Sequence, residues 1–177
     1  MLWGIIGLSG GGCWAGDSES DRATLRGVEG MYVIVEELEP EVERAGLTRH
    51  QLQTEVELRL RQVGIRVLTK EERLETPGAP WLYVNVNVVL RSDGLTAFST
   101  RVELNQVALL KTDGSLVIVP TWSVAYTGSV GSLRLSAIRN NVKDQVDHFI
   151  NAYLSVHPRS TGSATPSSTS PRSNLVH

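Results

Sequence analysis

The feature that most constrains the fold is an alternation of apolar and polar side chains at residues 81–90, Trp-Leu-Tyr-Val-Asn-Val-Asn-Val-Val-Leu. Alternation with a period of two is typical of a β-strand that has one face buried and the other face in water. Two three-residue loops that end in glycine follow, at residues 92–94 and 112–114. Such a loop favours a hairpin, because glycine accepts the positive φ that a type I turn with a bulge requires. Residues 81–127 are therefore predicted to form three antiparallel strands.

The same pattern predicts the register of both hairpins. With residues 92–94 as the first loop, apolar side chains face one another in the pairs Val88–Phe98, Val84–Val102 and Leu82–Leu104. A shift by one residue would turn one strand over and set charged side chains against the apolar face. For the second hairpin, the same counting predicts the pairs Leu104–Trp122, Ala108–Ile118 and Leu110–Leu116.

Shorter elements flank this meander. Residues 31–35 and 65–68 are predicted to be strands, and the helix between them has Thr48 as its cap and Gly64 at its end. A second amphipathic helix follows the meander, and its apolar stripe consists of Leu135, Ile138, Val142, Val146, Phe149, Ile150, Tyr153 and Leu154. The predicted fold class is α+β: a single mixed, mostly antiparallel five-stranded sheet in the order β-α-β-β-β-β-α, with two helices packed on one face.

The two ends of the chain differ in composition from the middle, so we predict one α+β domain at residues 28–157. Residues 158–177 are rich in Ser, Thr and Pro and are predicted to be a disordered tail, since they have too little apolar surface to bury. Residues 1–20 start with a short apolar run, followed by small and then polar residues. This order is typical of the end of a bacterial export signal or leader.

The apolar run is short and has no Lys or Arg before it, which one interpretation explains by a true start that lies upstream of Met1. Three other interpretations of the leader stay open. In the first, Cys13 is the lipidation site of a lipoprotein, although the Leu-Ser-Gly triplet at residues 8–10 lies two residues too early. In the second, the leader is an ordinary export signal cleaved after Ala15. In the third, it is a disordered start on a cytoplasmic protein. We expect export to the periplasm or cell envelope, with membrane contact only through a lipid anchor.

The composition argues against several function classes. The chain has 17 Lys and Arg against 19 Asp and Glu, a net charge of −2, and no basic stripe, so nucleic-acid binding has little support. The single cysteine cannot form an intramolecular disulfide. No Cys and His residues have the spacing of a zinc site, and no phosphate-binding loop is present. We therefore predict no metal, no cofactor and no catalytic residues, and a non-catalytic role is favoured over an enzyme.

The strongest candidate site is the end of the second hairpin, where apolar side chains are predicted on the face that should be polar: Val107, Leu109, Val117 and Val119. A hairpin end that is apolar on both faces must contact something, and another protein or a second copy of the chain is the expected partner. Alternatively, the 70–80 connection or the N-terminal segment covers it. A rival hypothesis is a small-ligand carrier or enzyme, with a cleft between helices and sheet lined by Phe98, Trp122, Tyr126 and Phe149.

A resemblance supports the envelope assignment. It rests on Gly64–Leu68, Trp81–Leu90, Thr121–Ser123 and Phe149–Leu154. Together these segments resemble an uncharacterised group of bacterial exported proteins, and the element order is similar to that of small α+β domains in envelope accessory lipoproteins. The resemblance covers about residues 30–157 and implies no activity, since a fold alone does not specify one. We expect an accessory or scaffolding domain that acts through protein–protein contacts.

Overall fold

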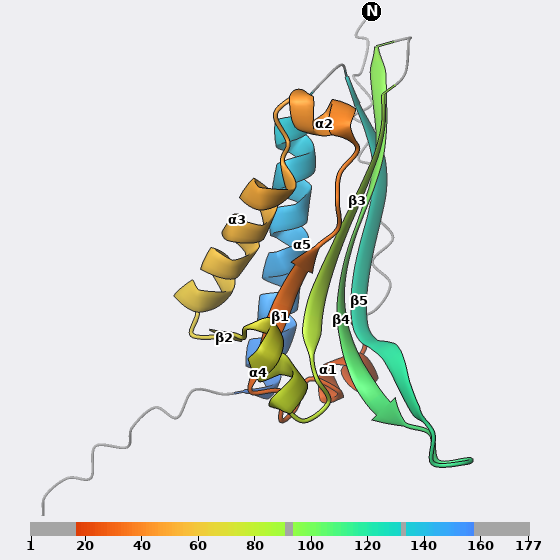
Figure 1. Ribbon diagram of the computed structural model, residues 1–177. Coiled ribbons are helices and arrows are strands. Elements are labelled where there is room, and N and C mark those ends of the chain that lie inside the picture. The colour runs from red at the N-terminus through yellow and green to blue at the C-terminus, as the bar shows by residue number, and fades with distance from the viewer. Residues whose placement is uncertain (1–16, 91–93, 132–133, 158–177) are drawn as a thin grey trace, which may run out of the picture.

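The computed structural model describes residues 17–90, 94–131 and 134–157. The elements in chain order are α1 (Glu19–Ala23), β1 (Gly30–Val35), α2 (Pro40–Arg44), α3 (Arg49–Gln62), β2 (Arg66–Val67), α4 (Lys70–Glu75), β3 (Trp81–Leu90), β4 (Leu95–Leu109), β5 (Leu116–Gly131) and α5 (Leu135–Val156). They form one mixed five-stranded sheet with helices beside it (Figure 1), which confirms the predicted α+β class. The predicted helix count is wrong, because the described residues contain five helices; α1, α2 and α4 are too short to show an amphipathic period.

The strands lie in the order β2-β1-β3-β4-β5. β1 is parallel to both of its neighbours, whereas β3, β4 and β5 are antiparallel. The predicted register of the first hairpin is confirmed, with Val84 opposite Val102 and Leu82 opposite Leu104. The sheet is therefore antiparallel along most of its hydrogen-bonded length, and β1 adds a short parallel part.

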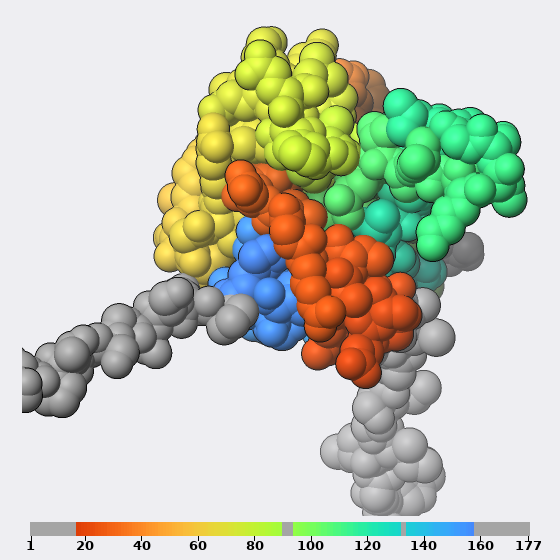
Figure 2. Space-filling model, turned by 90° about the horizontal axis from the view of Figure 1, so that it is seen from below, coloured from red at the N-terminus to blue at the C-terminus, as the bar shows by residue number. Residues whose placement is uncertain are grey.

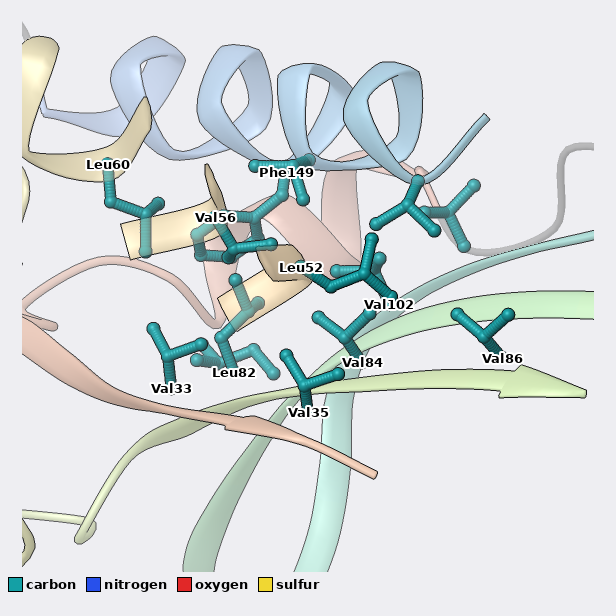
Figure 3. Packing of buried hydrophobic residues seen from close by; sticks show 14 of the residues in the cluster. Val33, Val35, Leu52, Val56, Leu60, Leu82, Val84, Val86, Val102 and Phe149 are labelled. Carbon is teal, nitrogen blue, oxygen red and sulfur yellow. The ribbon is translucent and has the colours of Figure 1, made fainter. Parts of the chain in front are cut away.

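The two long helices, α3 and α5, cover the same face of the sheet (Figure 1), as the sequence predicted. From α3, Leu52, Val56 and Leu60 point at the sheet, and Phe149 of α5 meets them (Figure 3). Val84 and other inward residues of the strands form the floor of this core. Removing this apolar surface from water stabilises the fold by about 25 cal/mol per Å².

The ends of α3 are those that the sequence predicted. The side chain of Thr48 accepts a hydrogen bond from the backbone N–H of Gln51 at the first turn. At the other end, Gly64 has a φ of +85°, and the N–H of Ile65 donates to the carbonyl of Leu60 at 2.9 Å. This six-to-one bond is the Schellman motif, which closes the helix and turns the chain toward β2.

The packed structure begins earlier than the predicted domain boundary at residue 28. Ser18 forms a capping box with Asp21 at the start of α1, and Leu25, two residues after this helix, is fully buried in the core. Arg22 binds Asp17 at 2.5 Å, and this guanidinium lowers the pKa of the Asp17 carboxyl. The predicted leader at residues 1–20 therefore overlaps a segment that packs with the domain, while its first sixteen residues and the 158–177 tail lie outside the described residues.

A polar group in the core was not predicted. Gln145 lies on the buried side of α5, and its Nε2 donates to the Thr100 Oγ1 at 2.6 Å and to the Asn141 Oδ1 at 3.1 Å. The Thr100 hydroxyl in turn donates to the same Asn141 oxygen at 2.5 Å. The Gln145 Oε1 makes no hydrogen bond to any described residue. The network joins α5 to β4 but leaves one buried acceptor unsatisfied.

We predict that removing the Thr100 hydroxyl and removing the Gln145 amide have different effects on the free energy of unfolding. Thr100→Val should lower the free energy of unfolding by about 1–3 kcal/mol, because the buried Gln145 amide loses a partner. Gln145→Met keeps the volume and removes the unsatisfied oxygen, so it should leave stability unchanged or raise it. Urea unfolding followed by circular dichroism measures both, and a Gln145→Met variant much less stable than Thr100→Val would contradict this account.

Candidate functional site

The β4–β5 hairpin extends past the end of its neighbour β3. The first residue of β3, Trp81, pairs with Asn105, so the hairpin continues beyond Asn105 without β3 beside it. There the chain before β3 provides one backbone bond, from the Val107 N–H to the Gly78 carbonyl at 2.8 Å. Figure 1 shows the hairpin turning away from the sheet at this end, and Figure 2 shows it, in green, projecting from the side of the molecule.

The register of the projecting end differs from the prediction. Leu104 pairs with Trp122 as expected, but Asn105 pairs with Pro120, which leaves Thr121 as an extra residue on β5. Beyond this β-bulge, the predicted pairs Ala108–Ile118 and Leu110–Leu116 are replaced by Ala108–Val117 and Leu109–Leu116. The prediction that Val107, Leu109, Val117 and Val119 share one face is therefore wrong: Val107 and Leu109 share a face with Ile118 and Leu116, and Val117 and Val119 lie on the other face.

The position of Pro120 gives a physical reason for the bulge. The Val107 N–H points away from β5, so the even-numbered residues of this part of β4 direct their backbone groups toward β5. The predicted register would place Pro120 opposite Gln106, where β4 needs a backbone N–H that proline lacks. In the observed register, Pro120 faces Asn105, where the backbone groups of the pair point away from each other. One extra residue thus avoids the loss of a ladder hydrogen bond.

The register change determines which apolar side chains are exposed at the hairpin end. Leu109, Leu116 and Ile118 share one face with relative exposures of 63%, 71% and 64%, and Leu110, the next residue after β4, is 41% exposed. We call these four residues the hairpin patch. The sequence reasoning named Leu109 but missed the other three, because it assigned Leu110, Leu116 and Ile118 to the buried face. Val107, Val117 and Val119 are half-buried.

Side-chain hydrogen bonds hold the base of the hairpin, near the bulge, in place. The Gln106 Nε2 donates to the carbonyl of Thr24 at 3.2 Å and to the hydroxyl of Thr121 at 2.8 Å. The Thr24 hydroxyl donates to the Thr121 carbonyl at 3.0 Å. The bulged residue therefore joins β5 to the segment after α1, and the patch is carried on an anchored arm.

The four aromatic residues of the rival cleft hypothesis belong to the core. The rings of Trp122 and Phe149 meet edge to face at 5.2 Å between centroids, and those of Phe98 and Tyr126 lie 5.7 Å apart. Trp122, Phe149 and Phe98 are buried, and Tyr126 packs against them. Two surface depressions formed by described residues lie elsewhere, one of about 510 Å³ beside the start of α3 and one of about 370 Å³ between α3 and α5. The packing gives the cleft hypothesis no support.

Other chemistry is sparse in the described part of the chain. Residues 17–90, 94–131 and 134–157 contain no group of three or more metal-ligating side chains. Within the same ranges, every helix is too short or too polar to cross a bilayer. Cys13, the candidate lipidation site, lies outside the described residues.

The face of the sheet opposite the helices carries a polar cluster. Asn85 donates to the carboxylate of Glu36 and accepts from the Asn87 side chain at 2.6 Å. Tyr83 lies beside them, and burial raises the pKa of its phenol to about 12, with the Glu36 carboxylate acting in the same direction. This cluster joins β3 to the end of β1, which favours a structural role.

In comparison with known proteins, no family model matches the chain, and no curated protein matches it.

The Tyr83 phenol gives a prediction for alkaline pH. Its pKa is raised above the unfolded value of about 10, so the folded state keeps a proton that the unfolded state loses. The contribution of Tyr83 to the free energy of unfolding should be constant below pH 10 and should decrease between pH 10 and about 12. Urea unfolding across this range, compared with Tyr83→Phe, measures the contribution; an equal fall in the variant would show that Tyr83 is not its source.

Proposed function

We propose that this chain is a non-catalytic accessory or scaffolding domain of the bacterial cell envelope, and that the hairpin patch is the surface through which it binds another protein. The observation that carries the proposal is the exposure of Leu109, Leu110, Leu116 and Ile118 together at the end of one anchored arm. Single exposed apolar residues are ordinary, but a contiguous apolar group on a projecting element is typical of an interaction site.

The form of the arm favours a protein partner. A rigid two-stranded arm loses little conformational freedom on binding, so most of the free energy of burying its apolar side chains would remain as affinity. The contacts from Gln106 and Thr24 hold the root in place without covering the patch. An apolar groove on a partner would bury the leucine side chains, while Lys111 and Asp113 at the turn would stay in water.

A charge placed in the patch should abolish partner binding without unfolding the domain. Leu109→Asp with Ile118→Asp alters two side chains that are 63% and 64% exposed, so the free energy of unfolding should change little. The matched control is Leu58→Asp with Leu74→Asp, which alters leucines of 52% and 63% exposure on α3 and α4.

The measurement is photo-crosslinking in cells, with a photoreactive amino acid in place of Leu116, followed by identification of the crosslinked protein. One specific product should form, should decrease at least about tenfold with the patch variant, which corresponds to about 1.4 kcal/mol, and should persist with the control. A product that survives the patch variant, or none at all, would reject the hairpin patch as the binding surface.

Export is a separate part of the proposal. The full chain expressed in a bacterium should be recovered from the envelope fraction with a new N-terminus before the capping residue Ser18, since cleavage within α1 would remove packed residues. Mass spectrometry of the recovered protein gives the cleavage site and shows whether Cys13 carries a lipid. An intact Met1 on a cytoplasmic protein would contradict export.

A further inference from the structure

We infer that a second copy of this chain pairs antiparallel with the outer edge of β5 along residues 122–131, so that two five-stranded sheets join into one continuous sheet. This segment differs from the hairpin patch, and the inference goes beyond the proposed partner binding.

The two edges of the sheet differ greatly in length. One edge is β2, with two residues, and the other is β5, with 16 residues. A long edge strand offers unpaired backbone groups to any other strand, and proteins usually protect it with charged side chains, proline or a bulge. β5 contains no Asp, Glu, Lys or Arg between Leu116 and Gly131. Pro120 and the bulge at Thr121 protect its lower part, but residues 122–131 contain no proline, no bulge and no charged side chain.

The hydrogen bonds between the strands determine which backbone groups of β5 point away from β4. The Glu36 N–H donates to the Val84 carbonyl, so Val84 directs its backbone groups at β1. Its neighbour Val102 therefore directs its groups at β5, where they meet Val124. In the alternate residues of β5, the backbone N–H and C=O groups point away from β4. These residues are Ser123, Ala125, Thr127 and Ser129. None of these four makes a backbone hydrogen bond to a described residue outside β4.

The side chains of this segment fit a second copy of the same strand. Trp122, Val124 and Tyr126 point to the helix side, and the residues between them are small, without charge, on the open side. Two such strands can pair antiparallel, edge to edge, about a two-fold axis perpendicular to the sheet. The equivalent faces of the two sheets then lie on the same side, and so do the helices of both copies. The contact is closed, because each copy uses the same edge. The absence of charge removes the repulsion that opposes pairing of identical strands.

The first experiment measures mass and backbone protection on the full chain. Sedimentation equilibrium at micromolar concentrations should give about twice the mass of one chain, which is 19.4 kDa. Amide hydrogen exchange should show the N–H groups of Ala125 and Thr127 becoming protected as the concentration rises, while those of Val124 and Tyr126 stay protected throughout. A chain that remains monomeric, or alternate amides that exchange rapidly in the dimer, would overturn the inference.

The second experiment alters the edge alone. Thr127→Pro removes an N–H that points to the free edge, so it costs no bond to β4 and should raise the dimer dissociation constant at least about tenfold. Thr127→Lys places a charge at the same position and keeps the backbone, which decides the outcome if the proline variant does not fold. The control is Ser99→Lys, because Ser99 lies directly opposite Thr127 on β4, away from the edge.

The variants also separate this inference from the proposed function. The edge variants should lose the dimer and keep the crosslinked partner, whereas Leu109→Asp with Ile118→Asp should keep the dimer. Loss of the dimer in the hairpin variant, with both Thr127 variants still dimeric, would place self-association at the hairpin patch and overturn the edge pairing.

Discussion

Burial of one apolar face of the sheet under α3 and α5 is the constraint on which the rest of the structure depends. The inward residues of β3 and β4, such as Val84 and Val102, reach this layer only in one register, because a shift by one residue would turn a strand over. That register leaves the opposite face of β3 to polar side chains such as Asn85 and Asn87, and the strand order places β5 at one edge of the sheet. The β4–β5 hairpin also continues past Trp81, the first residue of β3.

Proline at position 120 then determines the chemistry of the hairpin end. It cannot supply a ladder hydrogen bond, and the bulge at Thr121 moves it to a position where none is required. The same extra residue brings Leu116 and Ile118 to the face of Leu109, and its contacts with Gln106 and Thr24 hold the arm. A local backbone requirement thus produces both the exposed patch and its support, while β5 above the bulge pairs regularly with β4.

Sequence patterns predicted the local parts of this structure well. A short loop joins the strands of a hairpin, so side-chain alternation and the glycine at the loop end determine the pairing of β3 with β4. The ends of α3 were predicted for the same reason, because Thr48 and Gly64 act within one turn of the helix. The short helices α1, α2 and α4 were missed, since five or six residues contain too little periodicity. Half of the candidate hairpin residues were assigned to the wrong face, because counting along the strand assumes that no bulge intervenes.

By itself, the sequence determined the α+β class, the antiparallel meander, the two amphipathic helices and the uncharged character of β5, because each depends on neighbours close along the chain. Only the tertiary structure decided that β1 inserts between β2 and β3, that Gln145 finds its partners on β4, and that Leu25 belongs to the core. These contacts join residues far apart in the chain, and they form where the apolar faces of separate elements meet. No local sequence pattern specifies how these faces pack together. The surfaces that the packing leaves exposed are those available for binding.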